Sequence, residues 1–122
     1  MTPQRPRGER GSATTMTMPF LGVLLLVATV LAFQGGVLVA QRRAQAAADL
    51  AALAGAAAAQ RGDDPCTAAA ALAARNAALL ASCRRDGPGG REVVVSVERA
   101  GPSALGRSVT VDASARAGPS PP

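Results

Sequence analysis

The chain has 122 residues, of which 48% are apolar but only 2% aromatic, and its 13 basic and 8 acidic residues give a net charge of +5. This length allows one small domain with appended segments, and the scarcity of aromatic side chains excludes a large conventional core. Nucleic-acid binding is disfavoured, because the arginines beyond the N-terminal tail are scattered and no aromatic side chains are grouped to stack on bases. Without histidine, the commonest general base and zinc ligand are missing. We therefore expect no enzyme activity, no catalytic, cofactor or metal site, and no small-molecule substrate.

The N-terminal region is typical of a membrane anchor. Residues 1–11 form a basic tail that we expect to be disordered, and no residue between Gly11 and Gln41 is charged. Residues 20–39 form an apolar run that, as a helix, is about 30 Å long, the thickness of the hydrocarbon core of a bilayer. We predict a transmembrane helix within 12–61 whose core is 20–39.

The charges that flank this run predict its orientation. Positive residues are retained on the cytoplasmic side of a membrane. Three arginines precede the run and two follow it: Arg5, Arg7, Arg10, Arg42 and Arg43. We therefore expect a single-pass protein of the cell membrane, with its N-terminus in the cytoplasm and its C-terminal unit outside.

A cleaved signal peptide is the alternative interpretation of the same region. The basic tail would be the charged segment, residues 18–31 the apolar segment, and a signal peptidase would cut after Ala32. The product would be a small secreted binding protein stabilised by a disulfide. Hydrophobicity continues past this position to Ala40, which a cleaved signal does not require, so we favour the membrane anchor.

An alanine-rich segment follows the apolar run. Residues 41–60 contain neither proline nor a β-branched residue, so the helix is expected to continue without a break until Arg61-Gly62. Alanine offers little area to bury, and we expect close packing against other helices. Candidate packing positions are the small-residue stripe Ala28, Ala32 and Gly36, although the abundance of alanine and glycine also explains it, and Asp49, which is equally well explained as a solvated residue.

The two cysteines predict where the next helix ends. Asp64-Pro65 is a helix start, and an unbroken helix to Ser82 would place Cys66 and Cys83 about 25 Å apart, too far for a disulfide. A helix over 65–76 that ends near Asn76 lets an extended chain bring Cys83 back to Cys66. We predict this disulfide, and hence an oxidising compartment. Two free buried thiols are the alternative.

Three strands are expected after this helix, over 78–84, 91–99 and 108–116. Alternation predicts that Leu79, Ala81 and Cys83 face the helix in the first strand. In the second and third strands the inward residues are Val93, Val95, Val97, Val109, Val111, Ala113 and Ala115. The fold class is therefore α+β: a long N-terminal helix, then a small unit over 64–117 in which the 65–76 helix covers a three-stranded antiparallel sheet. Residues 118–122 are expected to be a disordered tail.

Two motifs carry a resemblance to a known family. They are Gly11-Ser12-Ala13-Thr14 ahead of the apolar run, and the pattern R-x-Q-x-A-A-D-x-A-A-L-A-G-A over residues 43–56. With these motifs the chain resembles the TadE and TadG proteins of tight-adherence (Flp-type) pilus systems. The two-cysteine form is similar to the actinobacterial TadE-like proteins encoded near helicase and secretion genes.

The resemblance implies a membrane-anchored minor pilin or pseudopilin that contacts other pilin-like or Tad secretion subunits through its N-terminal helix. It also implies prepilin-type cleavage between Gly11 and Ser12. The fifth residue of the mature chain is usually glutamate in such proteins, where it pairs with the amino terminus of a neighbouring subunit. Here that residue is Met16, which carries no charge, so a permanently uncleaved anchor is the alternative.

Overall fold

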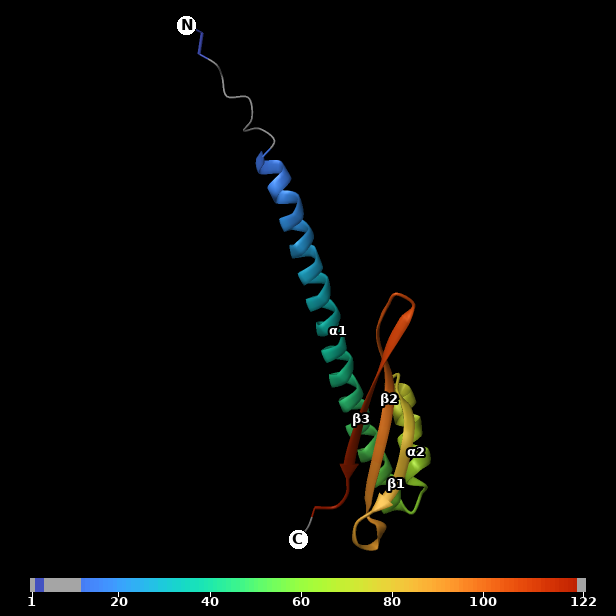
Figure 1. Cartoon of the computed structure of the whole chain (residues 1–122). Coiled ribbons are helices and arrows are strands. Elements are labelled where there is room, and N and C mark those ends of the chain that lie inside the picture. The colour runs from blue at the N-terminus through green and yellow to red at the C-terminus, as the bar shows by residue number, and fades with distance from the viewer. Residues whose placement is uncertain (1, 4–11, 121–122) are drawn as a thin grey trace. The chain divides into compact units, whose positions relative to one another are not determined.

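The structure, a computed structural model, describes residues 2–3 and 12–120, with the side chains of residues 12 and 13 left out (Figure 1). The predicted 1–11 tail and Gly11 of the cleavage motif therefore lie largely outside the described residues. The elements are α1 (Ser12–Arg61), α2 (Pro65–Arg75), β1 (Leu79–Asp86), a 3₁₀ turn (Pro88–Gly90), β2 (Glu92–Ala104) and β3 (Arg107–Ala117). The three strands form one antiparallel sheet in the order β1-β2-β3. The α+β class expected from the sequence is confirmed.

The chain divides into two compact units, residues 1–34 and Gly35–Pro122. Helix α1 contributes to both, so the folded C-terminal unit contains the last half of this helix. From the sequence we expected the unit to begin at residue 64, after the long helix. The difference arises because the alanine-rich segment supplies one side of the core.

One face of α1 is buried against the sheet. The buried alanines recur at intervals of three or four residues, which places them on a single helical face. They are Ala40, Ala44, Ala47, Ala48, Ala51, Ala52 and Ala56. Opposite them lie Val93, Val95 and Val97 of β2, each fully buried as predicted. The alanine face that we expected to meet partner helices is therefore occupied by the chain's own sheet.

The helix α2 completes the same core. Its N-terminal residue Pro65 and two of its alanines, Ala69 and Ala73, are buried together with the valines of β2. The inward positions of β3 are those predicted, because Val111 and Ala113 are buried and Val109 and Ala115 pack against the cluster. Both helices therefore contribute to one core with the sheet, where the sequence had suggested α2 alone.

Strand β1 differs from the predicted alternation. Leu80 pairs with Val97 but Ser82 pairs with Ser96, so Ala81 is an extra residue that forms a β-bulge. The bulge shifts the phase of the strand, and Leu80 and Cys83 both pack against the core while Leu79 is 74% exposed. The prediction that Leu79 and Ala81 face inward is wrong, and that for Cys83 is confirmed.

Helix α2 ends at Arg75 with Asn76 as its C-cap, close to the predicted end at residue 76. Asn76 caps the helix with ordinary negative φ, and its side-chain amide donates to the Leu72 carbonyl. The left-handed residue is Ala77, with φ of 54°, and the Ala78 amide donates back to the Ala73 carbonyl. This pair of features is a Schellman-type helix end.

The β2–β3 hairpin is longer than the sequence indicated. We expected a loop over residues 100–107, but the strands continue past an irregularity at Gly101-Pro102, and Ala104 pairs with Arg107. Proline is tolerated at such an irregularity because its missing N–H breaks no regular ladder bond. The two connecting residues, Leu105 and Gly106, have φ of 52° and 73°, which gives the tight turn typical of two-residue hairpins.

A glycine in α1 allows the helix to approach the sheet closely. A Cβ at Gly55 would lie 3.0 Å from Cγ1 of Val93 and 3.1 Å from the Pro65 carbonyl oxygen. Backbone cannot move aside as a flexible side chain can. Gly55 is therefore required for packing.

We predict that Gly55→Val lowers the free energy of unfolding by about 2 kcal/mol, because it overfills this contact. Gly35→Val is the matched control, since nothing lies within 4 Å of a Cβ at Gly35 in the same helix. Denaturant unfolding of the full chain in detergent measures both. Equal effects of the two substitutions would contradict the assigned role of Gly55.

Candidate membrane anchor and disulfide-closed unit

The first part of α1 is apolar on all sides. Among the described residues, α1 is the one helix that is both long enough and apolar enough to cross a membrane. Its large side chains are exposed in the folded chain, including Phe20 at 66%, Leu25 at 68% and Leu38 at 58%. A surface helix of a soluble domain has a polar face, whereas a helix that is hydrophobic all round needs an apolar surrounding. A membrane span or a signal sequence meets this requirement.

The small-residue stripe is divided by the fold. Ala28 and Ala32 are exposed on α1. Gly36 is half-buried. It lies against the β2–β3 hairpin, since a Cβ at Gly36 would be 3.4 Å from Cγ of Pro102. The structure therefore assigns an internal contact to Gly36.

Polar side chains of α1 bind the edge of the sheet, which the sequence analysis missed. Nε2 of Gln41 donates to the Asp112 carbonyl at 2.7 Å, and Nε2 of Gln45 donates to the Ser114 carbonyl at 3.0 Å. Gln45 also donates to Oδ1 of Asp49 at 3.1 Å. These bonds cover backbone acceptors of an edge strand, which would otherwise be open to pairing. Asp49, a candidate subunit contact, is exposed and accepts a hydrogen bond from the side chain that binds β3.

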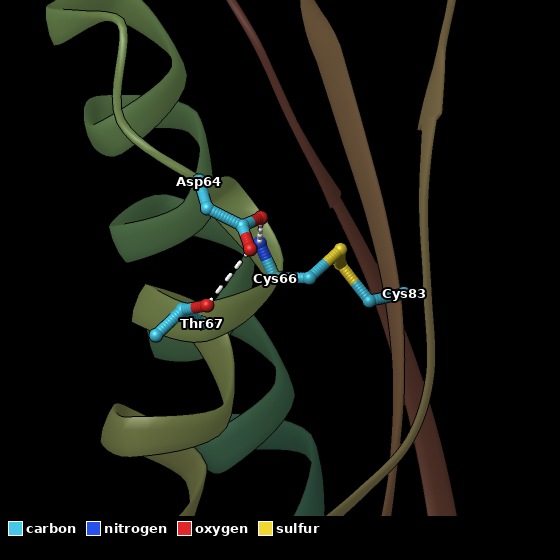
Figure 2. The surroundings of a disulfide bond; sticks show 4 residues. All are labelled: Asp64, Cys66, Thr67 and Cys83. Carbon is cyan, nitrogen blue, oxygen red and sulfur yellow. Dashed lines mark hydrogen bonds between the residues drawn. A yellow bond between two sulfur atoms is a disulfide. The ribbon is translucent and has the colours of Figure 1, made fainter.

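The predicted disulfide between Cys66 and Cys83 is present, with its Cα atoms 5.7 Å apart. It joins the first turn of α2 to the middle of β1 (Figure 2). Asp64 caps the same turn, since its carboxylate accepts from the Cys66 amide at 3.0 Å and from the Thr67 hydroxyl at 2.8 Å. The Thr67 hydroxyl and then the Cys66 amide lower the pKa of Asp64 below its ordinary value of 3.8.

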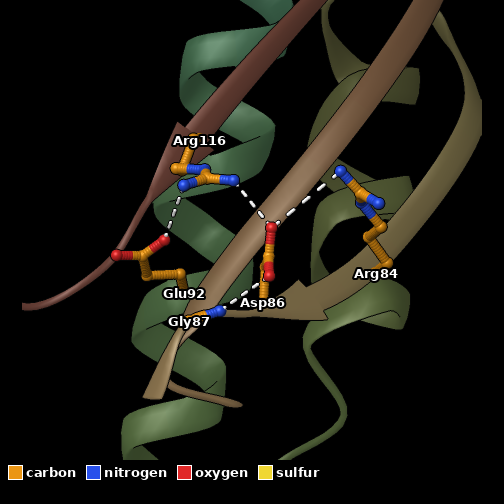
Figure 3. Close-up of polar contacts among 5 residues, drawn as sticks. All are labelled: Arg84, Asp86, Gly87, Glu92 and Arg116. Carbon is orange, nitrogen blue, oxygen red and sulfur yellow. Dashed lines mark hydrogen bonds and ion pairs between the residues drawn. The ribbon is translucent and has the colours of Figure 1, made fainter.

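Charged residues connect the three strands at the end of the sheet that lies opposite the β2–β3 turn. Arg116 of β3 contacts Asp86 of β1 at 2.6 Å and Glu92 of β2 at 3.1 Å, and Arg84 lies 3.9 Å from Asp86 (Figure 3). The Gly87 amide donates to Asp86 at 2.8 Å. This amide first, and then the charge of Arg116, lower the pKa of Asp86 below 3.8. The cluster is exposed, so its contribution to stability is small and depends on salt.

Arginine side chains line a surface cavity of the folded unit. Among the described residues, no group of three or more His, Cys, Asp or Glu side chains could hold a metal ion. A surface cavity of about 370 Å³ is lined by Gln60, Arg85 and Arg91 together with small residues. Its lining has cationic side chains but no carboxylate, which suits contact with anions or carbonyl groups.

Comparison with known proteins relates α1 to pilus assembly. The family model described as putative Flp pilus-assembly TadE/G-like matches residues 11–58. The match covers less than half of the chain and supports the resemblance drawn from the sequence motifs. No curated protein and no solved structure matches the chain. The similarity therefore concerns the helix that is both candidate membrane span and part of the core, and it supports a component of pilus assembly.

We predict that the double substitution Cys66→Ser with Cys83→Ser lowers the free energy of unfolding by about 3 kcal/mol. The two cysteines are 17 residues apart in the sequence, and the substitution opens the loop that the disulfide closes between them. Denaturant unfolding measures the change. Reduced wild-type protein should match the variant, while Ser82→Ala, beside the bridge, should match oxidised wild type. A variant as stable as oxidised wild type would contradict the role given to the disulfide.

Stability should fall in acid because of Asp64 and Asp86. The folded pKa of each is lower than the unfolded value near 3.8, so each stabilises the fold above that value and loses this contribution as the pH falls through the folded pKa. The double variant Asp64→Asn, Asp86→Asn keeps a side-chain oxygen that accepts hydrogen bonds at each position, but the asparagine amides do not titrate. Melting temperatures measured from pH 6 downward should therefore decline less steeply in the variant than in wild type, and parallel curves would refute the assignment.

Proposed function

We propose that the protein is a single-pass, membrane-anchored TadE-like minor pilin or pseudopilin, a structural component of a pilus-assembly or secretion apparatus. The observation that carries the proposal is that the exposed apolar part of α1 lies within residues 11–58, the segment similar to the pilus-assembly family. In this proposal the first part of α1 is the anchor. The part of the unit Gly35–Pro122 that follows the span is presented outside the membrane.

The packing of α1 supports partner contacts within the membrane. The alanine face beyond Ala40 is already covered by the sheet, so it has no free small-residue surface to offer. In the apolar part of α1, Ala28 and Ala32 are exposed small residues on one face, where a second helix can approach closely. Other pilin-like or Tad secretion subunits would therefore bind the apolar half of α1.

The disulfide and the flanking arginines support the orientation. A bridge between Cys66 and Cys83 persists in an oxidising compartment. The excess of arginine before the apolar run favours a cytoplasmic N-terminus. Both observations agree with a C-terminal unit outside the cytoplasm, at the cell membrane.

The start of α1 favours an anchor that keeps its leader. Cleavage after Gly11 would create a positive amino group at Ser12, the first residue of α1, where the helix dipole is also positive. The first turn of α1 contains no acidic residue, and position five is Met16. No carboxylate of that turn would then pair with the new terminus of a neighbouring subunit.

A secreted protein is the second candidate, because the boundary between the two compact units lies close to the alternative cleavage position. A cut after Ala32 would leave the whole unit Gly35–Pro122 intact. The core, the disulfide and the ion cluster all lie within it. This product would keep its fold without the membrane.

Locating the mature N-terminus and the fraction that contains the protein tests the proposal. Mass spectrometry of the protein from its host is expected to find Met1 or Thr2, in membranes that retain it after alkaline carbonate washing. A terminus at Ser12 would support a processed pilin-like anchor, and one at Phe33 in the soluble fraction would overturn anchoring. Ala32→Ile is the matched variant, because signal peptidase requires a small residue there. It should leave the mature N-terminus and the membrane retention of an anchored protein unchanged, and it should trap a secreted one in the membrane.

A further inference from the structure

The β2–β3 hairpin runs along α1 toward the apolar part of that helix. Three pairs are neighbours, because a Cβ at Gly55 would meet Val93, one at Gly101 would meet Ala40, and one at Gly36 would meet Pro102. As β2 advances, its contacts therefore move toward the N-terminus of α1. Figure 1 shows the hairpin projecting beyond β1 and α2. Its tip is the part of the sheet that reaches furthest in this direction.

The hairpin passes the point where α1 changes from polar to apolar. Residues 37–39 are Val, Leu and Val, whereas residues 41–43 are Gln, Arg and Arg. Gly36, the neighbour of Pro102, lies four residues before Ala40, which is about 6 Å along a helix on the apolar side of this border. Leu105 lies three residues beyond Pro102, a further step of at most about 10 Å.

The residue at the tip is unfavourable for a water-exposed turn. Leu105 is fully exposed, at 103% of its reference area, and has φ of 52°. This conformation at the first position of a two-residue hairpin turn favours Asn, Asp or Gly. Leucine there gains nothing from the fold of the chain, so its apolar side chain is available to an apolar environment.

Arginines lie close to the same border. Arg42 and Arg43 of α1, on its polar side, are exposed, and Arg107 is exposed directly after the turn. Long arginine side chains bind lipid phosphates while their stems remain among apolar groups. Apolar residues on one side of a border and the adjacent Arg42 and Arg43 on the other match the chemistry of a bilayer surface.

We propose that the tip of the β2–β3 hairpin, residues 103–107, is a second membrane contact, in which Leu105 inserts at the boundary between headgroups and acyl chains and Arg107 binds a lipid phosphate. The inference rests on the proposed anchoring by α1. It adds a lipid-binding site in the folded unit, so that this unit is held at the membrane at two points.

The absence of tryptophan and tyrosine from the chain allows a direct test by fluorescence. Three single-tryptophan proteins are made from the full chain: Leu105→Trp at the tip, Leu25→Trp in the proposed span, and Leu79→Trp on β1. Leu79 is 74% exposed and pairs with Glu98, on the polar side of the border. Each is reconstituted in phosphatidylcholine–phosphatidylglycerol vesicles, with and without acyl chains brominated near the headgroup. Retention of the disulfide on a non-reducing gel confirms that each variant folds.

The proposal expects Leu105→Trp to show blue-shifted emission and strong quenching by the brominated lipid, while Leu79→Trp emits as in water and is not quenched. If Leu25→Trp is in an apolar environment but Leu105→Trp resembles Leu79→Trp, the tip contact is wrong and anchoring stands. If Leu25→Trp also reports water, anchoring itself fails. Arg107→Gln in the Leu105→Trp background should reduce the quenching in anionic vesicles more than in vesicles of phosphatidylcholine alone, and an equal effect in both would refute the phosphate contact.

Discussion

The close approach of α1 to the sheet is the constraint on which the folded unit depends. Alanine side chains line one face of the helix and the fully buried Val93, Val95 and Val97 lie opposite. Each alanine removes little apolar area from water, so stabilisation must come from many contacts at short range. Gly55 shows how short that range is, since even a methyl group would press on Val93 and on the backbone at Pro65. The alanine composition of the helix is thus a packing requirement.

This packing gives α1 two roles in one continuous element. Its apolar part needs a surrounding that water does not supply, and its alanine part is half of a protein core. The change between the two occurs near Ala40, without a proline or a loop between them. A folded unit built in this way cannot be separated from its helix without losing its own core, which suits a small domain that is presented from a membrane.

The remaining contacts close a unit that is small for independent stability. Few large side chains are fully buried, and domains of this size usually need an additional constraint. The disulfide supplies it between α2 and β1, and the Asp64 cap fixes the turn that carries Cys66. At the edge of the sheet, Gln41 and Gln45 cover carbonyl groups of β3. These bonds also set the rotation of α1 about its axis, because its alanine face must then point at β2.

The sequence by itself determined the order of the elements and favoured the disulfide over two free thiols. A bridge between the two cysteines requires the chain to reverse near residue 76, and alternating valines predict β2 and β3. Only the tertiary structure decided what covers the alanine face. The sequence pattern of a face of small residues does not distinguish a helix from a sheet as its packing partner. The bulge at Ala81, which turns Leu80 inward and Leu79 outward, follows from pairing with β2 and has no local signal. The length of the β2–β3 hairpin also could not be predicted from the sequence, because Gly101, Pro102 and Leu105 disfavour a strand locally. Pairing across the turn and contact with α1 hold this segment in the hairpin.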